Sequence, residues 1–173
     1  MDLRSELRYA AVPETVFVMV TDEEFVSKKL TATGALSHEV TVSMGPEGGV
    51  SVHIEQVLPA QVPELARRFV GETVRVRQTD EWEPQGADGS RNGRFFVQIL
   101  GLPGKMAGTL RLEPGDDGGT VETFAGTIEV SIPFVGGKLA ALAADAVRAA
   151  IETEGRVGRA WLASRRGPSS PAG

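Results

Sequence analysis

The feature that most constrains this fold is a long helical segment that follows a series of strands. Between about 133 and 162 the chain is rich in alanine, and its apolar residues recur at helical spacing. The residues before it alternate between apolar and polar in short runs joined by glycine-rich turns, which is typical of strands. A sheet of that size needs an apolar cover on one face, and the closing helix supplies it. We therefore expect an α+β domain in which a curved antiparallel sheet of about seven strands surrounds a long carboxyl-terminal helix.

The individual elements can be placed by their alternation and by their turn residues. Two short helices are expected after the first strand; one begins at Pro13, and the other spans about 23–32 behind a capping box from Thr21 to Glu24. The stretch Pro59–Gly71 holds two prolines and should cross the mouth or edge of the sheet. The expected strands are 2–10, 36–44, 50–58, 72–83, 94–100, 105–113 and 120–131.

The closing helix contains two glycines, Gly155 and Gly158, near its end. Glycine is a poor helix former, so we expect a break there, after which Trp161 folds back on the domain or forms a self-association patch. The earlier residues Gly136 and Gly137 precede a lysine, but Leu139 follows it instead of Ser or Thr, which argues against a phosphate loop. These two glycines are better explained by close approach of the helix start to the sheet.

Composition narrows the classes of function. At 173 residues the chain fits one domain, expected at 1–164 with a disordered tail at 165–173. A net charge of −5 gives no electrostatic reason to expect a nucleic-acid partner. There is no cysteine and there are two histidines, so neither a metal nor an organic cofactor is indicated. No signal-like or membrane-length apolar run is present, which predicts a cytoplasmic protein without stable membrane insertion.

A cavity is expected between the inner face of the sheet and the closing helix. Small alanine residues on the helix would leave a hollow interior, although alanine is also simply the best helix former. The predicted lining residues are His38, Val76, Gln78, Trp82, Phe95, Val97, Leu110, Phe124, Leu139, Leu142, Ala143, Ala146 and Val147. No catalytic or metal-binding residue is assigned.

Some of these residues have a second interpretation. His38 could orient a ligand or transfer a proton, but no carboxylate near it in the sequence would orient its ring, which favours a rim or core histidine. Trp82 could form the bottom of the cavity, with Gln78 binding a polar end of the ligand. Alternatively, Trp82 could be an ordinary core residue. Asp80 also has inward parity, and because a buried lone carboxylate is unfavourable we expect a bulge or a solvent-facing strand end there. Arg67 and Arg68 fit a solvated helix face better than an anion clamp.

The order of elements resembles the START-like superfamily (SRPBCC), which has the helix-grip fold. That superfamily includes lipid-transfer domains, polyketide cyclases and plant pathogenesis-related proteins. The chain is more closely similar to an actinobacterial START-like family of unassigned function. The segments that carry this closer resemblance are Pro13-Glu14-Thr15-Val16-Phe17 with Thr21-Asp22-Glu23, Ala66-Arg67-Arg68-Phe69-Val70-Gly71-Glu72-Thr73 and Ile132-Pro133-Phe134-Val135-Gly136-Gly137-Lys138-Leu139. The resemblance implies a cavity for a hydrophobic ligand under the long helix and implies no reaction.

Three functions follow from these expectations. The first is the binding or carrying of a hydrophobic small molecule or lipid. The second is a cyclase- or hydrolase-type enzyme that uses the same cavity, with His38 as its candidate catalytic group. The third is a structural or regulatory module that binds a partner and has a filled core. The gate of a cavity is expected at Pro59–Gly71 and at the turn Gly101-Leu102-Pro103-Gly104. The sequence does not specify the ligand or the number of subunits.

Overall fold

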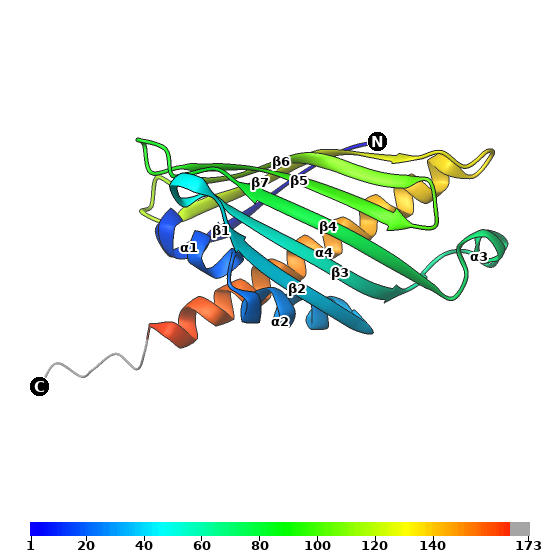
Figure 1. Cartoon of the computed structure of the whole chain (residues 1–173), viewed down its shortest axis with the longest axis horizontal. Helices are drawn as coiled ribbons and strands as arrows, with labels where there is room; N and C mark the ends of the chain where they lie inside the picture. Colours follow the sequence, from blue (N-terminus) through cyan, green and yellow to red (C-terminus); the bar gives the residue numbers. More distant parts are fainter. Residues whose placement is uncertain (167–173) are drawn as a thin grey trace, which may run out of the picture.

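The computed structural model describes residues 1–166 and shows one seven-stranded antiparallel sheet curved around a long helix (Figure 1). The strand order is β1-β7-β6-β5-β4-β3-β2, so strands β2 to β7 form a meander and β1 returns to pair with β7. The predicted fold class is confirmed. The strands are β1 (Asp2–Tyr9), β2 (Ser37–Met44), β3 (Val50–Pro59), β4 (Thr73–Trp82), β5 (Arg91–Leu100), β6 (Gly104–Pro114) and β7 (Thr120–Val130).

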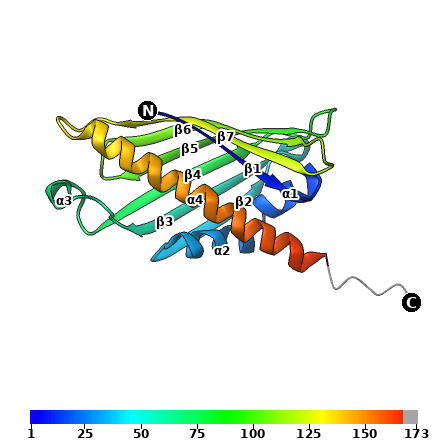
Figure 2. The ribbon, with the colours of Figure 1, turned by 180° about the vertical axis from the view of Figure 1, so that it is seen from behind.

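The helices lie on the concave face of the sheet or at its ends. They are α1 (Pro13–Val20), α2 (Glu23–Thr33), the short 3-10 turn η1 (Pro46–Gly48), α3 (Glu64–Val70) and α4 (Gly136–Arg165). Figure 2 shows α4 crossing the sheet diagonally, with α1 and α2 near its carboxyl-terminal half and α3 at the opposite end. No helix within residues 1–166 is long and apolar enough to span a membrane.

The local signals that begin and end α2 differ partly from the prediction. The predicted capping box is wrong, because Asp22 caps the helix and its side chain accepts a hydrogen bond from the Phe25 amide at 3.1 Å. Thr21 instead donates its hydroxyl to the Phe17 carbonyl in the last turn of α1, at 2.7 Å. Gly34 ends α2 in the left-handed conformation (φ 104°), as glycine commonly does at this position.

Helix α4 is continuous, so the predicted break at its glycines is wrong. A Cβ atom at Gly158 would lie 2.7 Å from the Tyr9 ring, and one at Gly155 would lie 2.9 Å from Leu7. Glycine is therefore needed for close packing on β1 and does not interrupt the helix. Trp161 continues the helix and packs edge-on against Phe25, with 5.5 Å between ring centroids.

The amino-terminal end of α4 also differs from the prediction. The helix begins at Gly136 and not at about 133. A Cβ atom at Gly136 would lie 2.4 Å from the Val130 carbonyl oxygen, which confirms that this glycine permits close approach to the sheet. Arg165 is the last residue of α4, and residues 167–173 of the predicted tail lie outside the described residues.

The core runs along α4, from Ala140 and Ala144 in its amino-terminal half to Trp161 and Leu162 near its end. Helices α1 and α2 contribute to it beside the carboxyl-terminal half of α4, where Phe25, Val16 and Val26 are almost completely buried. Trp82 joins the same core, since its ring meets Phe17 edge-on at a centroid distance of 5.9 Å. Neither α1 nor α2 lies beside the amino-terminal half of α4 (Figure 2), and we take the residues of that half and of the sheet opposite it as the candidate site.

Candidate functional site

The predicted lining residues are found in three environments. Trp82 belongs to the core described above, which favours its interpretation as ordinary core. Ala146 is exposed, so its assignment to the cavity is wrong; it lies too far around α4 from the face that packs on the sheet. The buried members are Val76, Trp82, Phe95, Leu110 and Leu139, and the half-buried members are His38, Gln78, Val97, Phe124, Leu142, Ala143 and Val147.

Half-buried apolar side chains occur both on the inner face of the sheet and on the amino-terminal half of α4. Val97 and Phe124 lie on the inner face of the sheet, and Leu142, Ala143 and Val147 lie on α4. Side chains in a closed core would be almost completely buried, as they are beside α1 and α2. They are less buried than the core beside α1 and α2, although Val97, Phe124, Ala143 and Val147 pack against that core. We call the region between these side chains of the sheet and of α4, together with Gln78, the crevice.

Two surface depressions lie at the α3 end of the sheet. One of about 520 Å³ is lined by the β7–α4 connection, residues 130–134, 136 and 137. The other, of about 340 Å³, is lined by 98–105 with Glu129 and Ser131. The two connections that form them are hydrogen-bonded to each other, since the Ser131 amide donates to the Pro103 carbonyl at 2.9 Å. Neither depression is lined by a predicted cavity residue, so both belong to the end of the molecule and not to its interior.

The same end carries exposed apolar side chains. Leu65 and Phe69 project from α3, and Phe134 is fully exposed in the β7–α4 connection. The backbone of Phe134 has φ 68°, a conformation that non-glycine residues rarely adopt. Figure 1 shows that α3 and the β5–β6 turn, the two segments predicted to form a gate, lie at this one end of the sheet.

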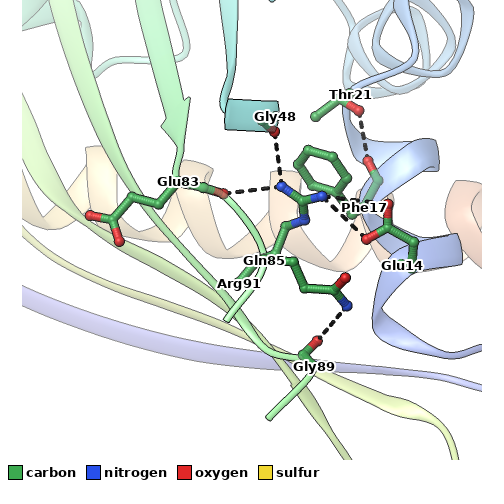
Figure 3. Close-up of polar contacts among 8 residues, drawn as sticks. All are labelled: Glu14, Phe17, Thr21, Gly48, Glu83, Gln85, Gly89 and Arg91. Atoms are coloured by element: carbon green, nitrogen blue, oxygen red, sulfur yellow. Dashed lines mark hydrogen bonds and ion pairs between the residues drawn. The ribbon is translucent and has the colours of Figure 1, made fainter. Parts of the chain in front are cut away.

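At the other end of the sheet, the buried side chain of Arg91 contacts three separate segments of the chain (Figure 3). The Arg91 side chain is 8% exposed and donates to the carbonyls of Gly48 and Glu83, both at 3.1 Å. It also reaches Glu14 of α1 at 3.3 Å, and its guanidinium stacks 3.5 Å from the centre of the Phe17 ring. These contacts fasten α1, the β2–β3 connection and the β4–β5 connection to each other.

A polar cluster lies beside the crevice, between the sheet and helices α2 and α4. Lys29 Nζ is 2.8 Å from Glu154 Oε2, with these side chains 14% and 8% exposed. Asp80 on β4 accepts a hydrogen bond from Gln78 at 2.8 Å, and Glu122 on β7 is 1% exposed. Tyr9 on β1 completes what we call the buried polar cluster: Tyr9, Lys29, Asp80, Glu122 and Glu154.

Burial and neighbouring charges shift the pKa of several of these groups. Burial raises the pKa of Asp80 to about 6, against the opposing effects of the Lys29 ammonium and the hydrogen bond from Gln78. Burial also raises the pKa of Glu122 well above its ordinary value, and the Glu154 carboxylate adds to this. Burial alone would lower the pKa of Lys29, but the carboxylates of Glu154 and Asp80 more than offset it, so that pKa is raised.

Two members of the cluster have polar atoms without a partner inside the described structure. These are the Tyr9 hydroxyl and Glu122 Oε2, both fully buried. Burial raises the pKa of Tyr9, and the Glu122 and Glu154 carboxylates raise it further. Within residues 1–166 no three acidic or histidine side chains are arranged as around a metal ion. The cluster therefore offers hydrogen-bonding capacity that the protein does not use itself.

Sequence reasoning missed most of this cluster. Glu122 shares inward parity with Phe124 and Ile128, and that parity was the available signal. Asp80 was expected at a bulge or at a solvent-facing end; instead it continues the regular register, opposite Phe95 and Val52, and is half-buried. The pairing of α2 with α4 that brings Lys29 to Glu154 has no local sequence signal.

The remaining candidates lie away from the cluster. His38 is half-buried on the edge strand β2, opposite Gln56. His53, which faces outward on β3 opposite Thr41, is exposed, and its ring lies 3.3 Å from the Thr79 hydroxyl. Arg67 and Arg68 are both exposed on α3, which agrees with a solvated helix face.

The architecture defines the class of protein. A seven-stranded antiparallel sheet gripping a long carboxyl-terminal helix, with two short helices after the first strand, is the helix-grip fold of START-like proteins. The chain belongs to the family described as "Protein of unknown function (DUF2505)", whose model matches residues 4–162.

Relatives in sequence come from mycobacteria. An uncharacterized protein of Mycobacterium tuberculosis (strain ATCC 25618 / H37Rv) is 28% identical over 120 residues, which is 68% of each chain. An uncharacterized protein of Mycobacterium bovis matches with the same figures. These relatives agree with the resemblance to an actinobacterial family of unassigned function.

Solved structures share the fold at lower identity. A protein of Thermus thermophilus is 23% identical with a TM-score of 0.67, covering 98% of this chain and 100% of that one. A START superfamily protein from Mycobacterium smegmatis is 16% identical with a TM-score of 0.56, over 90% and 96% of the chains. Ara h 8.0201 is 15% identical with a TM-score of 0.55, over 95% and 98%.

Proposed function

We propose that this chain binds a hydrophobic small molecule, such as a lipid, in the crevice between the sheet and the amino-terminal half of α4. The observation that carries the proposal is the partial exposure of apolar side chains on the inner face of the sheet and on α4. Val97 and Phe124 on the sheet and Leu142, Ala143 and Val147 on α4 are each only half-buried. Apolar side chains that converge around an accessible space favour a ligand that removes them from water.

The difference between the two ends of the sheet supports ligand entry from the α3 end. The Arg91 contacts fasten the α1 end, whereas the α3 end carries exposed Leu65, Phe69 and Phe134. Exposed apolar side chains around an opening provide a first contact for an apolar ligand. The strained backbone of Phe134 agrees with a functional reason for holding its ring in solvent. We therefore assign the entrance to α3, the β5–β6 turn and the β7–α4 connection.

An acid–base enzyme in the same crevice is the second candidate. The observation that favours it is Asp80, whose half-buried carboxyl has a pKa raised to about 6 by burial. This residue replaces His38 as the candidate catalytic group, because Asp80 lies beside the crevice and His38 lies on the edge strand. Turnover of a bound ligand that is lost in Asp80→Asn would favour this second candidate.

Titration with a neutral apolar fluorophore, N-phenyl-1-naphthylamine, tests the proposed function. We expect saturable fluorescence enhancement in the unaltered protein. Ala143→Trp, which fills the crevice from α4, should weaken probe binding by about tenfold or more. Ala149→Trp is the matched control, because Ala149 is exposed on the same helix. Equal binding by the two variants and the unaltered protein would place the probe elsewhere and overturn the proposal.

A further inference from the structure

Strand β1 lies at one edge of the sheet and pairs with β7 on one side only. The Met1 carbonyl accepts a hydrogen bond from the Ile128 amide next to β7 at 2.8 Å, whereas the Arg8 carbonyl accepts one from the Arg159 side chain at 3.4 Å. Backbone groups of successive strand residues point to opposite sides, so the even-numbered residues of β1 turn their N–H and C=O groups to the free edge. These residues are Asp2, Arg4, Glu6 and Arg8.

The same four residues carry all the charges of β1, and these charges alternate in sign along the strand. All four side chains are exposed on the outer face of the sheet. Arg4 and Glu6 lie 3.3 Å apart within the strand, and within residues 1–166 neither Asp2 nor Arg8 forms an ion pair. The residues directly opposite on β7 are uncharged: Thr127, Ala125, Thr123 and Val121. The chain therefore leaves a row of alternating charges along an open strand edge.

We propose that β1 pairs antiparallel with β1 of a second copy of this chain, with Ser5 opposite Ser5 about a two-fold axis. In this register Arg4 lies opposite Glu6 of the second copy. Asp2 likewise lies opposite Arg8 of the second copy. The symmetry repeats both pairs, so every charge on the edge meets an opposite charge. The paired residues are those whose backbone groups face the edge, so each pair can also exchange two hydrogen bonds.

The order of the charges selects this register over its neighbours. A register centred on Arg4 would place Arg4 opposite Arg4 and Asp2 opposite Glu6. One centred on Glu6 would place Glu6 opposite Glu6 and Arg4 opposite Arg8. Like charges directly opposite each other destabilise a strand pair. The register centred on Ser5 avoids every such contact.

Strand β1 lacks the features that usually protect an edge strand from a second chain. It contains no proline, its pairing with β7 is unbroken from Asp2 to Tyr9, and its inward-facing residues are uncharged. A row of like charges would repel a second copy, whereas alternating charges attract one. The opposite edge strand, β2, has Glu39 as its one charged residue besides the neutral His38, so pairing of β2 with itself gains no ion pair. The charges therefore favour the β1 edge.

Two arginines of α4 limit the length of the pairing. Arg159 donates to the Arg8 carbonyl and Arg166 donates to the Ala10 carbonyl, so the edge beyond Arg8 is already covered. Arg159 has to release the Arg8 carbonyl when the Asp2 amide of the second copy takes its place. That contact is long and exposed, so its loss costs little.

The proposed dimer is small and reversible. A short pair of strands buries less surface than a stable dimer needs, and we expect a Kd of about 10 to 100 µM. Opposite residues of paired strands point to the same face, so both copies of α4 would lie on one side of the joined sheet. The pairing needs no ligand in the crevice, and its failure would leave the proposed function unaffected.

Sedimentation equilibrium of the full chain in low salt at pH 7 measures the dimer. Arg4→Glu places like charges opposite each other twice and should weaken the dimer by about tenfold or more. Exchange of the two charges, in Arg4→Glu with Glu6→Arg, restores both pairs and should return the Kd to within about threefold of the unaltered protein. Arg111→Glu is the matched control, because Arg111 also pairs with a glutamate on its own strand, Glu113 at 2.9 Å, but lies on the interior strand β6. It should leave the Kd unchanged.

Amide hydrogen exchange locates the contact independently. The Arg4 and Glu6 amides should exchange more slowly as the protein concentration rises through the Kd, and the amides of β2 should not respond. Raising the salt concentration should weaken the dimer, because its ion pairs are exposed.

Weakening by Arg4→Glu that the charge exchange reverses supports the inference. A protein that stays monomeric up to about 1 mM overturns it, since this concentration lies well above the expected Kd. A dimer that Arg4→Glu leaves unchanged uses another surface, such as the β2 edge, and also overturns it. Weakening that the charge exchange does not reverse overturns the proposed register and with it the inference.

Discussion

Lys29 Nζ and Glu154 Oε2 lie 2.8 Å apart although 125 positions separate the two residues along the chain. This ion pair joins α2 to α4 at a place where both side chains are largely buried. A buried pair is sensitive to the loss of one partner, because the remaining charge has neither water nor a counter-charge. The pair therefore links the stability of the fold to the charge balance of the buried polar cluster.

Lys29→Met should lower the free energy of unfolding by about 3 to 5 kcal/mol, since it leaves Glu154 buried without its cation. The double variant Lys29→Met with Glu154→Gln should recover part of this loss, because the uncompensated carboxylate is removed. Urea denaturation of the two variants measures the difference. Lys105→Met, which breaks an exposed pair with Glu129, is the control and should change stability by less than about 1 kcal/mol. A double variant no more stable than Lys29→Met would contradict this account.

The raised pKa of Asp80 predicts that the free energy of unfolding depends on pH in a defined way. Its pKa is raised from 3.8 to about 6 on folding, so the folded state binds the proton more tightly than the unfolded state. The stability that this proton contributes is fully present below about pH 3.8 and is lost as the pH rises through about 6. Relative to the unaltered protein, Asp80→Asn should therefore gain stability between about pH 4 and pH 7, by up to about 3 kcal/mol.

Urea denaturation at several pH values in this window measures the Asp80 effect. Asp116→Asn is the matched control, because Asp116 is exposed in the β6–β7 turn and its replacement should give a constant difference. A difference between Asp80→Asn and the unaltered protein that does not change with pH would show that the carboxyl titrates normally.

Arg91→Lys should destabilise the α1 end of the sheet. A lysine cannot reproduce the fork that reaches Gly48, Glu83 and Glu14, nor the stacking on Phe17. We expect a loss of about 2 to 4 kcal/mol, measured by thermal and urea denaturation. Arg94→Lys, on the exposed face of the same strand, should stay within about 0.5 kcal/mol. Similar losses in the two variants would mean that the buried contacts of Arg91 contribute little.

The assigned entrance predicts a pattern of amide hydrogen exchange. Residues 60–72 and 101–104 should exchange faster than the paired strands, because few of their amides belong to the sheet ladder. Exchange in both segments should slow when N-phenyl-1-naphthylamine is bound. Slowing confined to 84–90, at the Arg91 end, would move the entrance to the opposite side.

The fold could be predicted from the sequence because burial of one sheet face imposes alternation. Strand β7 shows this well, since Phe124, Ile128 and Val130 share one face. The predicted break in α4 failed for a reason that lies outside the helix. Positions 155 and 158 need glycine because Leu7 and Tyr9 of β1 leave no room there for a Cβ atom. A single sequence does not show that close approach.

The site was harder to predict, because its residues come from strands and helices that are distant in the sequence. Inward parity predicts Gln78, Val97 and Phe124 as lining residues, and helical spacing predicts Ala143. Ala146 is the same residue type as Ala143, but it lies too far around α4 from the face that packs on the sheet and is exposed. Glu122 and Asp80 broke the rule that inward positions are apolar, and such exceptions concentrate at functional sites.

The central claim is that an apolar molecule lies between the sheet and α4, and methyl NMR tests its location most directly. Spectra of protein labelled at alanine, valine and leucine methyls are recorded with and without dodecanol. The account predicts that the largest shift changes fall on Val97, Leu142, Ala143 and Val147, while Val121 on the outer face of β7 stays unchanged. Changes confined to the outer face or to the connections at the α3 end, with the four crevice residues unaffected, would contradict it.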